Sequence, residues 1–442
     1  MDTLIKAVER FISGDWGEEK CSPDSSEKVV CIRGADIENV QGGIYDSIPN
    51  RYISSSSLAN KKLKIGDIVI EKSGGSPTQS TGRTCYISED LIKEKKDVVC
   101  SNFCAAFSIR ETWDYKYIYY YIQNIYNQGN FFNFEGKTSG IRNLLLDTAF
   151  KSIPLPPIDK TIQTKLSGIL ERIDQKISLN TRMNAELEAM AKQLYDYWFV
   201  QFDFPFDFAQ GKPDENGKPY KSSGGKMVWN EKLKREIPEG WEVVLISDLI
   251  EEKKSGDWGQ DEMKGSYTLK VNCIRGADFK KPTNAPERFI NSKNNNRLLE
   301  EDDIVVEISG GSPIQATGRS VYVSKGLLCH YNNSLTCSNF CQALTCCDKT
   351  IAPYFFYVWN MFYDNNVMFN YEGKTSGIKN LLIDMFLNNN WYLPPIQILS
   401  VFATTIKRLM STKDSNVKEI NHLTRLRDSL LPMLMNGQVT IE

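Results

Sequence analysis

Histidine is nearly absent from the sequence, which has only two, His330 and His422, among 442 residues. Neither has a counterpart elsewhere in the chain, so catalysis by paired histidines is effectively excluded. No stretch reaches the roughly 18 apolar residues of a membrane span, and the N-terminus lacks a charged leader followed by an apolar signal core. We therefore expect a cytoplasmic protein without membrane contact, whose 11 cysteines stay reduced.

An excess of positive charge is also missing, since 53 basic and 55 acidic residues give a formal net charge of −2. A chain that bound nucleic acid through overall attraction would be basic, so any such surface must be local. The hydrophobic fraction of 41% and the charged fraction of 24% are ordinary for a globular protein. The length allows two or three domains with their own cores.

The catalytic motifs of several enzyme classes are incomplete or absent. The Pro-Pro pairs lack the preceding Asp or Asn and the following aromatic residue of an amino-methyltransferase loop. Asp67 and Glu71 begin a nuclease pattern, but Ser73 occupies the position of its lysine. The cysteines of CSNFC have a Cys-x-x-x-Cys spacing rather than that of a zinc knuckle. We expect no catalysis, and no metal or cofactor bound by this chain.

The tripeptide Gly-Lys-Thr occurs twice, in EGKTSGIRNLL (135–145) and EGKTSGIKNLL (372–382), without the remainder of a phosphate-binding loop. Such a loop needs a glycine five positions earlier, where this chain has Phe131 and Met368. Neither residue adopts the required tight turn cheaply. We therefore interpret the motif as one part of an internal repeat.

Five further motifs recur in the same order. They are SGDWG at 13–17 and 255–259, CIRGAD at 31–36 and 273–278, SGGSP at 73–77 and 309–313, TGR at 81–83 and 317–319, and CSNFC at 100–104 and 337–341. Their spacing drifts by only a few residues, as loop-length changes between two copies of one domain would produce. Strand-like and helix-like patterns alternate within each copy, which predicts a mixed α+β fold.

Each copy is followed by a long segment with apolar residues at three and four spacing, which predicts a helix with an apolar seam. We divide the chain into a first domain at 1–158, a first long helix at 159–200, an extended connector at 201–240, a second domain at 241–396, a second long helix at 397–437 and a tail at 438–442. Helices of this length need a partner, and we expect them to pair with each other. The strand-like 241–249 lacks a counterpart in the first copy, and we expect residues 438–442 to supply it.

Polar residues that recur beside the glycine motifs are candidates for a binding surface. Gln and Arg pair well with purine edges in the major groove, whereas Lys, Thr and loop amides suit phosphates. The candidates are Arg33, Gln79, Arg83, Lys137, Thr138, Arg142, Arg275, Gln315, Arg319, Lys374, Thr375 and Lys379. The alternative is that the glycines form tight turns whose side chains are merely solvated. We interpret Trp16 and Trp258 as packing anchors.

Four segments carry a resemblance to a known family: WFVQFDFPF (198–206), GKPYKSSGGKMVWN (217–230), IPEGWE (237–242) and RLRDSLLPMLMNG (425–437). With the repeat, the chain resembles over nearly its whole length the specificity subunit of type I restriction–modification systems. The resemblance implies two α+β target-recognition domains separated by an antiparallel coiled coil of two long helices, related by pseudo-two-fold symmetry. It also implies a non-catalytic chain that reads a bipartite double-stranded DNA site. The implied partners are two modification subunits, which bind S-adenosylmethionine and methylate adenine N6, and a restriction subunit.

The similarity of the two copies predicts similar half-sites on opposite strands, and therefore a target close to an interrupted palindrome. Departures from symmetry are expected where the copies differ, as at Thr78 and Ile314 or at Ser80 and Ala316. Two other interpretations stay open. The chain can be the recognition subunit of a type IIB-like assembly, or a scaffold that binds only protein through its helices.

Overall fold

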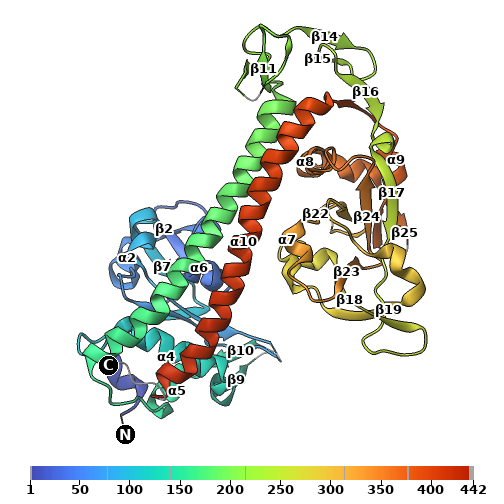
Figure 1. Cartoon of the computed structure of the whole chain (residues 1–442). Coiled ribbons are helices and arrows are strands. Elements are labelled where there is room, and N and C mark those ends of the chain that lie inside the picture. Colours follow the sequence, from blue (N-terminus) through green and yellow to red (C-terminus); the bar gives the residue numbers. More distant parts are fainter. Residues whose placement is uncertain are drawn as a thin grey trace. The chain divides into compact units, whose positions relative to one another are not determined.

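The computed structural model describes residues 2–76, 78–138, 141–214, 216–312, 314–375 and 378–437 (Figure 1). The chain forms two compact units, the first drawn from Met1–Arg182 and Glu419–Glu442 and the second from Met183–Lys418. Each unit therefore combines one repeated copy with one end of each long helix. Both contain helices and strands, so the predicted α+β class is confirmed.

In the first unit, the first copy contains helices and short strands. The bounds are β1 Val8–Ser13, β2 Glu27–Ile32, α1 Ile37–Gln41, β3 Asn50–Ile53, α2 Ser55–Lys61, β4 Ile68–Glu71, β5 Ser73–Gly74, β6 Thr84–Tyr86, α3 Glu89–Glu94, β7 Val98–Cys100, β8 Cys104–Ile109, α4 Tyr115–Asn127, β9 Glu135–Thr138, β10 Ile141–Leu144 and α5 Leu146–Ser152. The strands form sheets with the orders β1-β8-β4-β6, β3-β2-β7 and β5-β10-β9. Strands β2 and β7 run parallel, whereas the other pairs in these sheets are antiparallel.

The second copy repeats this arrangement strand for strand. Its bounds are β17 Ile250–Ser255, β18 Tyr267–Ile274, β19 Glu287–Asn291, β20 Ile304–Glu307, β21 Ser309–Gly310, β22 Ser320–Tyr322, α7 Lys325–Leu328, β23 Ser334–Cys337, β24 Cys341–Cys346, α8 Ala352–Asp364, β25 Glu372–Thr375, β26 Ile378–Leu381 and α9 Ile383–Leu387. Its sheets have the orders β17-β24-β20-β22, β19-β18-β23 and β21-β26-β25, again with one parallel pair, β18 and β23. The repeat in the sequence is thus a repeat of topology.

Helix α4 supplies much of the core of the first unit. Asp114 caps its N-terminus, because a carboxylate oxygen accepts a hydrogen bond from the Tyr117 backbone N–H at 2.8 Å. Ile118 and Ile122 of α4 are fully buried in one apolar cluster with Ile68 of β4. Burying each such side chain stabilises the fold by about 1.5–3 kcal/mol.

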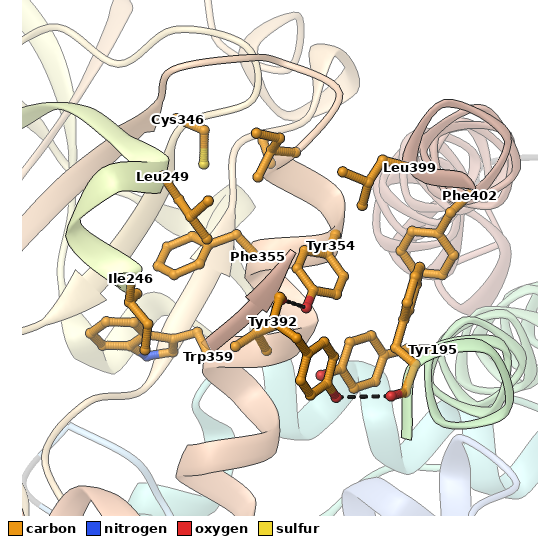
Figure 2. Close-up of a cluster of buried hydrophobic side chains, with 14 of the residues drawn as sticks. Tyr195, Ile246, Leu249, Cys346, Tyr354, Phe355, Trp359, Tyr392, Leu399 and Phe402 are labelled. Carbon is orange, nitrogen blue, oxygen red and sulfur yellow. Dashed lines mark hydrogen bonds between the residues drawn. The ribbon is translucent and has the colours of Figure 1, made fainter. Parts of the chain in front are cut away.

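The corresponding core of the second unit includes the ends of both long helices. Figure 2 shows Tyr195 and Phe402 beside Tyr354 of α8 in one buried cluster. The Tyr354 hydroxyl donates to the backbone oxygen of Tyr392 at 2.7 Å, which satisfies a polar group inside the cluster. The helix ends are therefore part of the domain core rather than attachments to it.

The long helices are α6, Lys160–Tyr195, and α10, Ile396–Met435. A single π-helical turn, Asp196–Val200, extends α6 to the end of the segment predicted at 159–200. Helix α10 ends within two residues of the predicted 437. Across the parts of the chain that the structure describes, no helix combines the length and apolar character needed to span a bilayer.

Polar contacts join the helix segments inside the first unit. Arg427 Nη1 lies 3.0 Å from Asp174 Oδ1, and the Tyr120 hydroxyl of α4 donates to the other oxygen of this carboxylate at 2.7 Å. Asn180 Nδ2 donates to Glu419 Oε2 at 2.8 Å. Asp174 of α6 pairs with Arg427 of α10, whereas the later residue Asn180 pairs with the earlier residue Glu419. The two helix segments therefore run in opposite directions.

The second unit contains an equivalent pairing of the remaining helix segments. Asn416 Nδ2 donates to Asn184 Oδ1 at 2.9 Å, and Lys413 forms an ion pair with Glu188. The later residue of α6, Glu188, again pairs with the earlier residue of α10, Lys413, so these segments also run in opposite directions. In each unit, therefore, the repeated domain packs together with two helix segments of opposite direction.

The connector has more structure than the turns expected from its sequence. It contains the strands β11 Pro205–Asp207, β12 Lys212–Pro213, β13 Lys218–Pro219, β14 Met227–Asn230 and β15 Arg235–Pro238. Its aromatic residues Phe202, Phe204 and Tyr220 are buried in the same cluster as Tyr392. Phe204 stacks on Tyr220 with ring centroids 4.7 Å apart. The connector therefore adds to the core of the second unit.

The second copy begins with β16, Glu242–Leu245, which pairs with β27, Asn390–Leu393. Residues 438–442, which we expected to supply this strand in the first copy, lie outside the described residues. The adjoining end of α10 is described, and Leu431 and Leu434 are buried in the core of the first unit.

Gly326 of α7 packs directly on α10, and a methyl group at this position would lie 2.3 Å from Asp414 Cβ. We expect Gly326→Ala to lower the free energy of unfolding by about 1–3 kcal/mol, because the domain must shift on the helix. Gly168→Ala in α6 is the matched control, since nothing lies within 4 Å of its added methyl. The control should raise stability by up to about 1 kcal/mol. Equal urea midpoints for both variants would contradict this packing.

Candidate DNA interface

Two of the repeated motifs meet because they follow neighbouring parallel strands. CIRGAD continues from β2 and CSNFC from β7, and the register pairs Ile32 with Cys100. The Ser101 backbone N–H donates to Ile32 O at 2.9 Å, and Ser338 donates to Ile274 at the same distance in the second copy. Since the carboxyl ends of parallel strands lie at one edge of a sheet, both loops emerge side by side.

The SGDWG motif packs against this edge. The Asp15 backbone N–H donates to Cys100 O at 2.7 Å, and Asp257 donates to Cys337 O at the same distance. A methyl group on Gly14 would lie 1.9 Å from Ser101 O, so only glycine fits the approach of the two backbones. The motif is therefore a structural support for the CSNFC loop.

A buried carboxylate joins three more motifs. Glu71, with a side chain only 5% exposed, accepts Arg83 Nε at 2.9 Å and Nη2 at 2.7 Å. Methyl groups on Gly34 and Gly74 would lie 2.7 and 2.8 Å from Glu71 Oε1. The ion pair therefore fastens the CIRGAD, SGGSP and TGR loops together. The hydrogen bonds between the Arg83 guanidinium and the Glu71 carboxylate raise the pKa of Arg83.

A second buried carboxylate joins the EGKTSG hairpin to the same group of loops. Glu135 Oε1 accepts the Thr81 backbone N–H at 2.7 Å, while its Oε2 accepts Arg142 Nη1 at 2.7 Å. In the second copy, Glu372 accepts the Thr317 backbone N–H at 2.7 Å and pairs with Lys379 at 2.8 Å. All the repeated glycine motifs of a copy thus form one connected loop surface.

The first carboxylate pair recurs in the second copy. Glu307, also 5% exposed, accepts Arg319 Nε at 3.0 Å and Nη2 at 2.6 Å. Methyl groups on Gly276 and Gly310 would each lie 2.6 Å from Glu307 Oε1. The same bidentate geometry therefore supports both loop surfaces.

The structure divides the candidate residues into three groups. Arg83, Arg319, Arg142 and Lys379 are partly buried and paired with the carboxylates described above. Their first role is to hold the loops in place.

Arg33 and Arg275 are bound to Asp36 and Asp278, yet their side chains remain 42% and 46% exposed. Gln79 and Gln315 are exposed, and each amide nitrogen reaches a tyrosine hydroxyl, at 3.4 and 3.3 Å respectively. These four side chains are available at the surface.

The third group comprises Lys137, Thr138, Lys374 and Thr375. Their backbones belong to the hairpin strands β9 and β25, while their side chains lie outside the described part of the structure. The assignment of all twelve candidates as DNA contacts stays a prediction.

Sequence reasoning missed the carboxylates that organise the surface. In the sequence, Glu71 stands out only as part of an incomplete nuclease pattern, and Glu135 and Asp36 are not among the candidate residues. The signal was present, because Glu307, Glu372 and Asp278 recur at the equivalent positions. Acidic residues kept in both copies beside kept basic residues indicate internal ion pairs.

The cysteines of the CSNFC motif belong to the core. Cys100 and Cys104 are buried, and burial raises the pKa of each thiol, to about 12 for Cys104. Among the residues that the structure describes, no group of three or more His, Cys, Asp or Glu side chains is placed to hold a metal ion.

Comparisons with known proteins point to one family. Residues 27–189 match the family described as the type I restriction modification DNA specificity domain. The chain is 24% identical over 308 residues to the type I restriction enzyme MjaIX specificity subunit of Methanocaldococcus jannaschii; the match covers 67% of this chain and 63% of that protein. It is 22% identical to the HindI specificity subunit of Haemophilus influenzae, over 65% of this chain and 69% of that protein.

The fold has a counterpart among solved structures. The crystal structure of a type I restriction–modification S subunit from M. genitalium superposes with a TM-score of 0.54 at 15% identity, covering 98% of this chain and 95% of that chain. With the matches above, the resemblance inferred from the sequence is confirmed.

We expect Glu71→Ala to destabilise the first unit by about 3–5 kcal/mol, because Arg83 is left partly buried without a partner. The double variant Glu71→Leu/Arg83→Met should lose much less, since it removes both charges. Urea unfolding of the full chain measures the difference. The control Asp97→Ala removes an exposed pair with Lys62 and should change the midpoint little. A double variant as unstable as Glu71→Ala would count against this role.

Proposed function

We propose that this chain is the DNA-specificity subunit of a type I restriction–modification complex, and that each repeated domain recognises one half of a divided DNA site. The observation that carries the proposal is the single loop surface in each copy. Two buried carboxylates join four of the repeated motifs there, and backbone hydrogen bonds attach SGDWG and CSNFC to them. The match of residues 27–189 to the DNA specificity domain supports it.

The exposed groups of this surface suit a DNA duplex. Arg33 offers a cationic side chain that is 42% exposed, and Gln79 offers an amide that hydrogen-bonds to base edges. The buried Glu71–Arg83 pair holds both loops before DNA arrives. A preformed surface loses less conformational entropy on binding than mobile loops would.

In this proposal the helices form an antiparallel coiled coil that sets the spacing between the two half-sites. The opposite direction of the paired segments within each unit supports this role, as does the Asn184–Asn416 hydrogen bond. A partly buried polar pair in a helix seam helps to fix the register of the two helices. We also propose pseudo-two-fold symmetry between the copies, which the matching sheet orders support.

The proposal assigns catalysis to partner subunits. Two modification subunits bind S-adenosylmethionine and methylate adenine N6, a restriction subunit joins the larger complex, and this chain has no catalytic role. We place the complex in the cytoplasm, where reducing conditions suit the free cysteines of this chain.

The structure narrows the positions at which the half-sites are expected to differ. Ser80 and Ala316, one of the two pairs at which departures from symmetry are expected, are each only 3% exposed, which leaves little of either side chain for a direct contact. Ile314 is 93% exposed and its counterpart Thr78 is exposed as well. Position 78/314 is therefore the better candidate for asymmetry.

Selection from a pool of random duplexes by the full chain, with its modification subunits where needed for solubility, tests the proposal. We expect one enriched sequence with two half-sites that form a near-palindrome around a fixed gap. Methylation mapping in a host that expresses the complex should find the same sequence. Two unrelated half-sites would refute the symmetry, and the absence of any enriched sequence would refute DNA recognition.

Two kinds of substitution should separate base contacts from phosphate contacts. Gln79→Ala should relax the preference at one position of one half-site and cost about 1–3 kcal/mol there. Lys137→Ala should weaken binding to all duplexes and reduce the salt-dependence slope by about one unit. Titrations of selected and unrelated duplexes over a salt series measure both effects. Unchanged binding by both variants would show that these side chains do not contact DNA and are solvated groups beside the glycine turns.

A further inference from the structure

One apolar side chain projects from the loop surface of each copy. Phe103 is 58% exposed and its counterpart Phe340 is 56% exposed. Their neighbours in the same motif are buried, with Ser101 at 2% and Cys104 at 0%. Isolated apolar residues are common on protein surfaces, but here the same ring projects from the same loop position in two copies that have diverged elsewhere.

The loop that carries the ring is fixed rather than loose. The Phe103 backbone oxygen accepts the Lys72 N–H at 2.8 Å and the Ser73 N–H at 3.0 Å. In the second copy, the Phe340 backbone oxygen accepts hydrogen bonds from the Ile308 N–H at 2.9 Å and the Ser309 N–H at 3.2 Å. The backbone therefore directs the ring outward at a defined position beside the SGG turn.

Phe103 also lies on the edge that carries the exposed Arg33. Both residues follow the carboxyl ends of the parallel strands β2 and β7, whose last residues Ile32 and Cys100 are paired in register. The equivalent edge in the second copy carries Arg275 and Phe340. The ring thus belongs to the same surface as the candidate base-reading residues.

The surroundings of the ring favour DNA over a protein partner. Protein interfaces bury a contiguous apolar core of many residues. Next to Phe103 the chain presents exposed Asn102 and partly exposed Lys72 and Ser73, which form no such core. In the major groove, by contrast, a single apolar side chain has a matching contact, because thymine presents a C5-methyl group there.

We propose that Phe103 and Phe340 are specificity-determining residues, each contacting the C5-methyl group of a thymine in its own half-site. The inference rests on the proposed function and extends it to residues outside the polar candidates. The ring acts through apolar contact, so it adds sequence preference without adding salt dependence.

The test uses the full chain, with its modification subunits where needed for solubility, and the duplex that the wild type selects. Phe103→Ala should lose the thymine preference at one position of one half-site and bind that duplex about tenfold more weakly. Phe340→Ala should do the same in the other half-site. Deoxyuridine in place of that thymine should weaken wild-type binding roughly fourfold, as expected for the loss of one buried methyl group. The same replacement should not change the affinity of the phenylalanine variant for the duplex.

Trp229→Ala is the matched control, because Trp229 is 57% exposed but lies in the connector, outside both copies. Trp229→Ala should keep the sequence preference of the wild type in both half-sites and its affinity for the selected duplex. Unchanged thymine preference in both phenylalanine variants would overturn the inference and leave the proposed function intact. Equal losses on selected and unrelated duplexes would also overturn it, with thermal melting reporting any loss of fold. A wild type that selects no sequence would overturn both.

Discussion

The ion pair between a buried glutamate and an arginine, Glu71–Arg83 in the first copy and Glu307–Arg319 in the second, holds the interface loops together. A glutamate this deep is costly unless its charge is compensated and its oxygens are hydrogen-bonded. The bidentate arginine meets both needs, and glycines at 34 and 74 leave room for the carboxylate. Loss of either partner therefore disturbs the SGGSP and TGR loops together with the CIRGAD loop, which is distant from both in the sequence.

The repeat, the mixed fold class and the long helices are predictable from the sequence because each has a local or periodic signature. Motifs such as CIRGAD recur in order, and apolar residues recur at helical spacing over 159–200. The structure gives α6 as Lys160–Tyr195 with one further helical turn, close to that range. The strands of the connector were missed, because their stability comes from aromatic packing of Phe204 and Tyr220 rather than from a regular pattern.

The roles of individual polar residues are much harder to predict. Arg83 and Gln79 are equally plausible base readers in the sequence, but only Gln79 is exposed in the structure. The difference depends on Glu71, which is 12 residues from Arg83 and is brought into contact only by the fold. Phe103 is a similar case, since no sequence pattern states whether a phenylalanine between buried cysteines points inward or outward.

The first unit is completed by the far end of the chain, because Leu431 and Leu434 fill its core and Arg427 binds Asp174. During synthesis, residues 1–182 emerge from the ribosome long before residues 419–437 are translated. The apolar face that Leu431 and Leu434 later cover therefore stays exposed in the nascent first domain while more than 200 further residues are translated. That delay makes the early chain a natural client for chaperones, and it makes a stalled translation product more hazardous than a chain that ends after an autonomous domain.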